Sequence, residues 1–366
     1  MRSQEDQVWY HVDVNSAYLS WTAAYRVCIL GEDLDLRDIP SVIGGSEAER
    51  HGIVLAKSGS AKRYGIRTGE TLAEARCKCP GLVIVPPDYS LYVSCSKALV
   101  ELLKKYFPHV HQYSIDEAFC RVEGTKGLWG THTAFAHQLK EEIRRELGFT
   151  VNIGVSDCKL LAKMASEFQK PDQVHTLFTR EIERKMWPLP VSDLFWVGPA
   201  TVRKLGALGI RTIGELAVMD LELLKRHLKK QGEFIWNYAN GRDVSPFLRE
   251  LPRNKGYGNS MTTPFDVTDR ETAWQVILSL TETVCARLRA DGMEAACVGI
   301  SITDREFRHG SVQTTLISAT DTTLEIYEAA RSLFDRLWNY SPIRRMGVYT
   351  SKVSPKGHYQ YQLFDR

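Results

Sequence analysis

Residues 11–20 read HVDVNSAYLS and residues 113–119 read YSIDEAF. The first stretch continues an apolar, β-rich run over residues 8–14, which predicts a buried strand with Asp13 near its end. The second predicts a hairpin with Asp116 and Glu117 at its turn. If the three strands are neighbours, three carboxylates converge at one sheet edge, which is costly unless cations are bound there. Spacing alone equally allows Asp13 to be a helix cap and Asp116 and Glu117 to be ordinary turn residues.

The surrounding elements predict a mixed α/β sheet. Helices are expected over residues 15–28, with Asn15 or Ser16 as N-cap, over 90–106, and over 131–147, where Gly148 provides the stop. Strands are expected at 82–87 and 150–156, and Ser156 or Asp157 is a candidate cap for the next helix. Strand, helix, two strands, helix, strand is the ferredoxin-like plan, with its helices expected on one face.

After residue 175 the sequence pattern changes and predicts short, basic helices with glycine-containing turns. Residues 246–256 carry two prolines and little pattern, which is typical of a linker. From Tyr257 a second α+β unit is expected. Its helices are predicted at 270–290 and 322–338, and its strands near 295–303, 311–318 and 344–351.

Bulk composition is that of a soluble, multidomain protein. The 366 residues are 43% hydrophobic and 25% charged, with a net charge of +3, which permits nucleic-acid binding without arguing for it. No apolar run approaches the roughly 20 residues of a membrane-spanning helix. The eight cysteines are scattered, and Cys77 and Cys79 lack the second pair that a zinc site needs. We therefore expect reduced thiols in an intracellular protein.

Together HVDVNSAYLS, YSIDEAF and VNIGVSDCKLLAKMASEFQKPD (151–172) resemble the palm motifs of the Y-family, DinB/UmuC-type translesion DNA polymerases. The stretch at 41–58 is also similar to fingers of Gram-positive bacterial enzymes. The resemblance implies a right-hand fold with a ferredoxin-like palm, small fingers, a helical thumb and an α+β little finger. The implied ranges are palm 1–24 and 83–175, fingers 25–82, thumb 176–245, linker 246–256 and little finger 257–366.

The same resemblance implies the chemistry of the site. Asp13, Asp116, Glu117 and the backbone carbonyl of Val14 would hold two Mg²⁺ ions, which Mn²⁺ can replace. Hard oxygen ligands suit Mg²⁺, and two such ions can activate a 3′-hydroxyl and stabilise the leaving pyrophosphate.

Four further residues match nucleotide-binding positions. Tyr18 corresponds to the steric gate, a ring that leaves no space for a 2′-hydroxyl, and Ala17 lies beside it. Lys62 and Lys170 match triphosphate contacts. The fingers depart from the common pattern, because Gly59 and Lys62 replace a Tyr and an Arg. A lysine supplies a point charge without the bidentate fork of arginine. Small residues at Ala17, Gly59 and Ala61 would leave room around the new base pair.

Residues 196–217 (WVGPATVRKLGALGIRTIGELA) resemble a helix–hairpin–helix, whose turn at Gly198 exposes amides to phosphate. Arg203, Lys204 and Arg211 are candidate neutralisers of DNA charge. In the little finger, Arg305 and Arg344 are expected to face DNA, together with Arg308, Arg345 and Lys352. His109 and His111 are expected to be surface histidines.

The resulting hypothesis is a template-directed polymerase of low fidelity and low processivity that uses dNTPs on primer–template DNA. The resemblance implies a cytoplasmic, nucleoid-associated monomer. A catalytically weak DNA-bound scaffold and a nucleotide cyclase are the alternatives. All three carboxylates argue against the first, and the helix–hairpin–helix argues against the second. The tail residues Gln360, Leu363 and Phe364 resemble a sliding-clamp peptide, although Tyr361 departs from its usual Leu.

Overall fold

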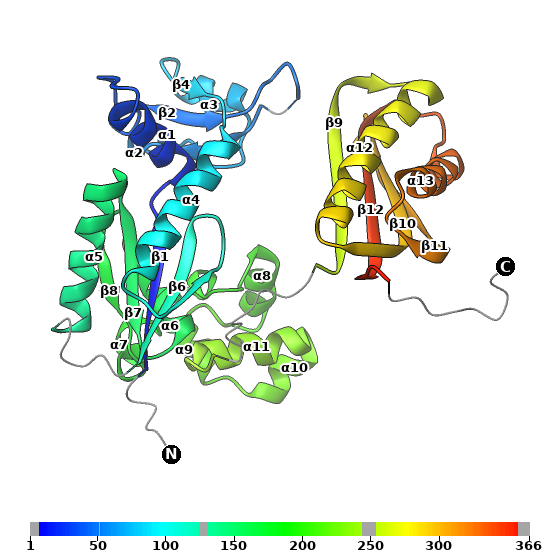
Figure 1. Ribbon diagram of the computed structural model, residues 1–366. Coiled ribbons are helices and arrows are strands. Elements are labelled where there is room, and N and C mark those ends of the chain that lie inside the picture. Colours follow the sequence, from blue (N-terminus) through cyan, green and yellow to red (C-terminus); the bar gives the residue numbers. More distant parts are fainter. Residues whose placement is uncertain (1–6, 51, 124–129, 244–253, 358–366) are drawn as a thin grey trace. The chain divides into compact units, whose positions relative to one another are not determined.

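The computed structural model describes residues 7–50, 52–123, 130–243 and 254–357 (Figure 1). The chain divides into two compact units, one over residues 1–44 and 53–249 and the other over residues 45–52 and 250–366. Most of the expected linker, and the tail with Gln360, Leu363 and Phe364, lie outside the described residues. Within the described ranges, no helix is long and apolar enough to cross a membrane.

A five-stranded sheet forms the centre of the first unit (Figure 1). Its order is β5-β6-β1-β7-β8, and neighbouring strands are antiparallel except β7 and β8, which are parallel. With β8 set aside, the order is that of a ferredoxin-like sheet, which confirms the predicted fold class. The strands are β1 (Gln7–Val14), β5 (His109–Gln112), β6 (Glu117–Glu123), β7 (Val151–Ser156) and β8 (Val174–Thr176).

Helices cover both faces of this sheet. Alternate residues of β1, from Val8 to Val14, pack with α4 (Tyr89–Lys104) and α5 (His132–Leu147). On the opposite face, under α6 (Lys159–Glu167), Trp9 packs with Ala162. The two helices of the predicted plan, α4 and α5, therefore lie on one face as expected, and α6, which follows the last strand of that plan, covers the other. Every residue of β7 is buried, so both of its faces are covered.

The first turn of α6 is capped from far along the chain. Its N-cap, Cys158, makes no side-chain capping bond, and the amide of Leu160 donates to Asp243 Oδ2 at 3.2 Å. The prediction that Ser156 or Asp157 caps α6 is wrong, because both side chains are engaged elsewhere. The Ser156 hydroxyl donates to Leu177 O, and Asp157 accepts from the Thr179 amide.

A small three-stranded sheet of order β3-β2-β4 occupies the range expected for the fingers. The helix α1 (Ala17–Cys28) leads into it after Ser16, which has a φ of 49° and makes no side-chain capping bond. The strand predicted at 82–87 is β4, which runs parallel to β2 in this sheet. Residues 83–85 thus join this small sheet rather than the five-stranded one. The elements are β2 (Ser41–Gly44), β3 (Val54–Lys57), α2 (Gly59–Arg63), α3 (Leu72–Lys78) and β4 (Val83–Val85).

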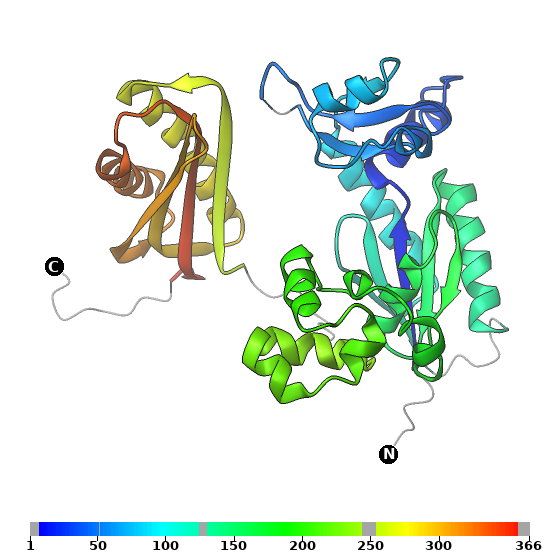
Figure 2. The same cartoon turned by 180° about the vertical axis from the view of Figure 1, so that it is seen from behind.

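Short helices follow β8 and share an apolar core with α6 (Figure 2). Gly198 precedes α8, whose first residue is Pro199, the position where a missing N–H costs least. The elements are η2 (Thr179–Glu181), α7 (Ile182–Lys185), η3 (Val191–Asp193), α8 (Pro199–Ala207), α9 (Ile213–Ala217), α10 (Leu221–Leu228) and α11 (Lys230–Ala239).

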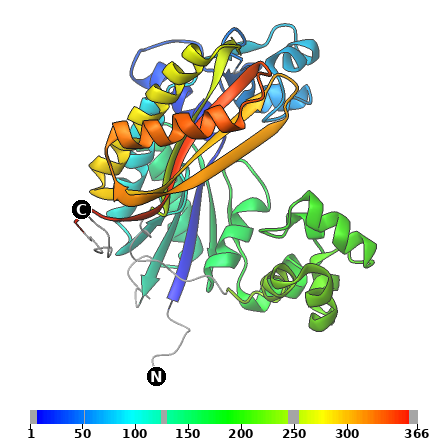
Figure 3. The ribbon, with the colours of Figure 1, turned by 90° about the vertical axis from the view of Figure 1, so that its right-hand side faces the viewer.

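The second unit is a four-stranded antiparallel sheet of order β11-β10-β12-β9 whose core is closed by two helices (Figure 3). The predicted helices and strands are present, and β9 is an additional strand that the sequence pattern did not indicate. The elements are β9 (Gly256–Val267), α12 (Arg270–Ala290), β10 (Met293–Asp304), β11 (His309–Thr320), α13 (Thr323–Leu337) and β12 (Ile343–Pro355).

The close approach of α6 to β7 depends on Gly154. A Cβ at this position would lie 1.9 Å from Ala162 O and 2.6 Å from Ser166 N, both backbone atoms of α6. We expect Gly154→Ala to lower the free energy of unfolding by about 1–3 kcal/mol through overpacking. Gly206→Ala is the matched control, because a Cβ there meets nothing within 4 Å. In a helix that change should stabilise by up to ~1 kcal/mol. Urea denaturation followed by circular dichroism compares the two, and equal stability for Gly154→Ala and the parent would contradict the packing argument.

Candidate active site

Strand register brings the predicted carboxylates together. Asp13 of β1 lies directly opposite Glu117, the first residue of β6. Asp116 occupies the preceding turn, and its carbonyl accepts a hydrogen bond from the Val14 amide at 3.1 Å. The three acidic residues predicted from two distant motifs therefore meet at one edge of the sheet.

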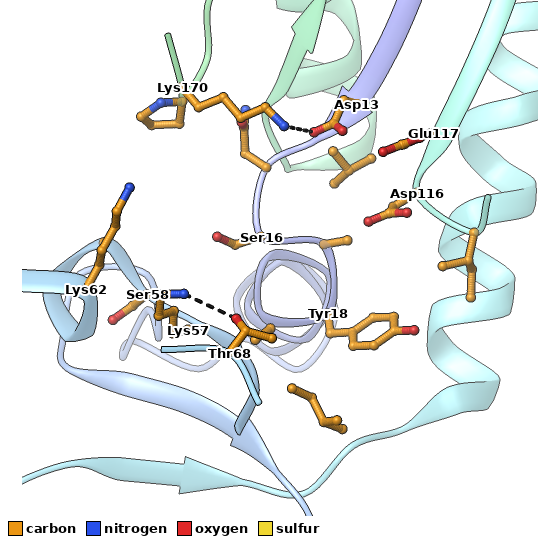
Figure 4. Close-up of a pocket in the computed structure, with 18 of the residues that line it drawn as sticks. Asp13, Ser16, Tyr18, Lys57, Ser58, Lys62, Thr68, Asp116, Glu117 and Lys170 are labelled. Carbon is orange, nitrogen blue, oxygen red and sulfur yellow. Dashed lines mark hydrogen bonds and ion pairs between the residues drawn. The ribbon is translucent and has the colours of Figure 1, made fainter. Parts of the chain in front are cut away.

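A cavity of about 570 Å³ opens at this edge (Figure 4). It is bounded by the end of β1, the start of α1, the β5–β6 turn, the end of α6 and the fingers. The predicted residues Val14, Ala17, Tyr18, Lys62 and Lys170 all line it, as does Gly59. Ala61, expected near the new base pair, is fully buried in the fingers core and is not among the lining residues.

A fourth carboxylate joins the cluster. One oxygen each of Asp13, Glu117 and Glu167 lies within 4.8 Å of the others, a spacing that could hold a metal ion. Glu167, on the last turn of α6, was not singled out from the sequence. The only signal was its helical spacing from Lys163 and Lys170 along one face. The Asp116 carboxylate instead accepts a hydrogen bond from the Ser114 hydroxyl at 2.6 Å.

Lys170 lies between two of these carboxylates. Its Nζ donates to Asp13 Oδ1 and to Glu167 Oε1, each at 2.9 Å. Burial raises the pKa of Asp13 to about 7 against the opposing charge of Lys170, and Glu167 and Glu117 add to the rise. The Asp13 carboxylate is therefore held in an environment where a further cation would be strongly favoured.

Glu117 has its own cation. The buried Lys163 donates to Glu117 Oε2 at 2.9 Å, and its Nζ lies 5.5 Å and 5.0 Å from the ring centroids of Tyr113 and Phe195. Burial opposes ionisation of Glu117, but the neighbouring His11 and the charge and hydrogen bond of Lys163 outweigh it and hold its pKa at about 2. Glu117 is therefore ionised, and Lys163 fixes its orientation. Sequence reasoning passed over Lys163.

His11 lies beside the same carboxylate, within hydrogen-bond distance of Ser166 but not of Glu117. It is fully buried, its Nδ1 lies 2.7 Å from Ser166 Oγ, and its Nε2 lies 3.6 Å from Glu117 Oε2. Burial lowers its pKa to about 4, so the ring is neutral at pH 7. A neutral imidazole avoids adding a second buried charge beside Lys163.

Tyr18 forms a rigid wall of the cavity. Its ring stacks on that of the buried Tyr92, with centroids 4.4 Å apart and an interplanar angle of 10°, and packs against Trp21. The Tyr92 hydroxyl lies 3.2 Å from Thr22 Oγ1, which holds the stack in place. Figure 4 shows the Tyr18 ring beside Asp116. This arrangement suits a residue that excludes atoms by its bulk.

The remaining predicted residues are not among those that line this cavity. In the thumb, Gly198 starts α8, and Arg203, Lys204 and Arg211 are exposed. In the second unit several basic side chains already have partners. Arg305 pairs with Asp266 and Arg308 pairs with Asp304. The Arg344 guanidinium lies over the Phe307 ring, and Arg345 and Lys352 donate to Ser260 and Thr315. His109 and His111 are half-buried on β5 rather than exposed, because that strand pairs with β6.

Comparisons with known proteins cover nearly the whole chain. Residues 12–167 match the impB/mucB/samB family, and residues 254–363 match the C-terminal domain of that family. The chain is 45% identical to a DNA polymerase IV of Clostridium acetobutylicum over 98% of this chain and 90% of the relative. It is 35% identical to DNA polymerase IV 2 of Bacillus subtilis over 98% and 88%.

A solved Y-family DNA polymerase chimera has the same fold, with a TM-score of 0.80 over 95% of this chain and 99% of the chimera at 18% identity. Both family models, the relatives and the fold agree with the palm motifs. The chain therefore belongs to the impB/mucB/samB family, the Y family of DNA polymerases.

Proposed function

We propose that this chain is a DNA-directed DNA polymerase that extends primers past damaged template bases by two-metal nucleotidyl transfer, with low fidelity and low processivity. One observation carries the proposal: carboxylates, a rigid aromatic wall and several lysines line a single cavity. The names of the relatives, DNA polymerase IV, support the same reaction. The small residues Ala17 and Gly59 at the cavity fit a loosely packed site that tolerates altered bases.

The donor set fits divalent cations. Asp13, Asp116 and Glu117 offer hard carboxylate oxygens, and the raised pKa of Asp13 reflects crowding that a cation would relieve. These residues, with the Val14 carbonyl, would hold Mg²⁺ ions, or Mn²⁺ in their place. When bound, such ions lower the pKa of an attacking 3′-hydroxyl and stabilise a leaving pyrophosphate.

The chain's own side chains supply orientation and selectivity. Lys163 keeps Glu117 ionised and oriented, and Lys62 and Lys170 are placed to neutralise triphosphate charge. Tyr18, held by its stack on Tyr92, would exclude a 2′-hydroxyl.

Duplex DNA would be held outside the cavity. The exposed Arg203 and Lys204 on α8 follow a turn that can present backbone amides to phosphate without reading sequence. Dependence on a sliding clamp through Gln360, Leu363 and Phe364 rests on the sequence alone. A tether of that kind would raise the local concentration of a low-processivity enzyme at the primer end.

Replacing any one carboxylate tests the catalytic proposal. We expect Asp13→Asn, Asp116→Asn and Glu117→Gln each to slow single-nucleotide primer extension with Mg²⁺ by about 10²-fold or more, the scale of losing one electrostatic partner. Glu101→Gln, an exposed change on α4, is the control and should be neutral. Normal extension by any of the three variants would contradict the assignment, and an inactive parent would favour the scaffold alternative.

The same variants separate chemistry from folding. The folded pKa of Asp13, about 7, lies above its ordinary value of 3.8, so ionisation costs stability and the metal-free fold weakens as pH rises between these values. Asp13→Asn should therefore unfold at the same or a higher temperature than the parent at pH 8 in EDTA. A lower midpoint would show that the carboxylate is needed for folding.

Sugar selection is a second test. Tyr18→Ala should lower the preference for dNTP over rNTP in kcat/KM by roughly tenfold or more, because a missing wall admits a 2′-hydroxyl. Tyr89→Ala is the control, because this exposed ring touches the Tyr18 cluster at its edge but does not line the cavity. If Tyr18→Ala discriminates between the two sugars as the parent does, Tyr18 is a core aromatic residue with no role in sugar selection.

Thumb contacts are tested by salt. Arg203→Glu together with Lys204→Glu should weaken binding to all DNA sequences by a similar factor and flatten the log–log salt slope by about one per lost contact. Lys104→Glu together with Arg145→Glu, both exposed on palm helices, should leave the slope unchanged. Fluorescence anisotropy at several salt concentrations measures both, and an unchanged thumb slope would exclude these side chains from the phosphates.

A further inference from the structure

A pair of lysines lies on the fingers side of the active-site cavity. Lys57 is the last residue of β3, and Lys62 lies in the short helix α2; both line the cavity. Figure 4 shows them across the cavity from Asp13, Asp116 and Glu117. Sequence analysis selected Lys62 and left Lys57 unassigned.

Neither lysine forms an ion pair among the described residues. No described carboxylate lies within ion-pair distance of Lys57 or Lys62, and the nearby Glu70 pairs instead with Lys78 at 2.5 Å. The Nζ of Lys57 donates to the neutral Thr68 Oγ1 at 3.2 Å. Burial lowers the pKa of Lys57, and the positive charge of Lys62 lowers it further. Two like charges held close in this way fit a site for an anion.

The backbone holds Lys57 in place. It pairs with Val42 in the fingers sheet, and the next residue, Ser58, is the N-cap of α2. The Ser58 hydroxyl accepts from the Ala61 amide at 3.0 Å and donates to Ile39 O at 2.7 Å. The chain on both sides of the lysine is therefore anchored, so little ordering is needed when a ligand binds.

Gly59 leaves room for this lysine to act. A Cβ added at Gly59 would meet nothing within 4 Å, so the position contributes open space to the cavity wall and no side chain that could bind an anion. Lys57 lies two residues earlier on the same wall, where its ammonium group can bind an anion that position 59 cannot bind.

We propose that Lys57 is a further nucleotide ligand, which binds the β,γ-phosphate end of the incoming nucleoside triphosphate together with Lys62. The inference rests on the proposed function. The charge arrangement supports it, because the carboxylates, which would hold metal ions, lie on one side of the cavity and the fingers lysines lie across from them. A side chain at this end selects triphosphates over diphosphates.

Lys57→Met tests the proposal in the full-length protein with primer–template DNA. Methionine keeps the apolar stem and removes the charge. We expect KM for dNTP to rise about tenfold or more, as for loss of a charge-assisted hydrogen bond, with kcat changed much less. The inhibition constant of inorganic tripolyphosphate should rise by a similar factor. On a dideoxy-terminated primer, the affinity ratio of dNTP to dNDP should fall, and Lys57→Arg should largely restore it.

Lys104→Met is the matched control, because it removes one exposed lysine from α4 away from the cavity. It should leave KM, tripolyphosphate inhibition and the nucleotide ratio unchanged, and both variants should unfold at the parent's temperature. The proposal is overturned if Lys57→Met keeps KM and tripolyphosphate inhibition within twofold of the parent. It is also overturned if dNTP and dNDP weaken equally. An inactive parent would reject the proposed function instead.

Discussion

Repulsion between the carboxylates of Asp13, near the end of β1, and Glu117, at the start of β6, is the constraint on which the site depends. The register that sets Asp13 opposite Glu117 cannot be changed by one residue without turning every side chain of β1 to the other face. The pairing of β1 with β6 therefore holds the two acids close together. Lys170 and Lys163 each donate to one of them. For the largely buried Lys163–Glu117 pair, removing one partner typically costs about 3–5 kcal/mol.

Both cations depend on where α6 lies. Lys163 is in α6 and Lys170 follows it, and the helix reaches β7 only because Gly154 has no side chain. The same close approach carries Glu167 to the cluster and buries His11 against Ser166. The close contact between Gly154 and the backbone of α6 thus links the packing of this helix to the charge balance of the site. The helix lies on the face opposite α4 and α5.

The cavity has walls of different character. Carboxylates occupy the sheet edge, the Tyr18–Tyr92 stack provides a stiff aromatic wall, and lysines occupy the fingers side. A nucleoside triphosphate has matching parts: a sugar that is sensitive to bulk, and phosphates that attract cations directly and carboxylates through Mg²⁺. The thumb and the second unit add exposed basic residues that suit the phosphate backbone of DNA.

Much of this could be predicted from local sequence. The strand ending at Asp13, the hairpin at Asp116 and the helix stopped by Gly148 follow from apolar periodicity and turn chemistry, which act over a few residues. Tertiary structure alone decided which sheet β4 joins, which face α6 covers and that Asp243 caps it. It also decided that Glu167 meets Asp13 and that Lys57 lines the cavity with no ion-pair partner in the described part of the chain. These outcomes depend on contacts between residues far apart in the chain, where packing and electrostatics select partners that no local pattern records.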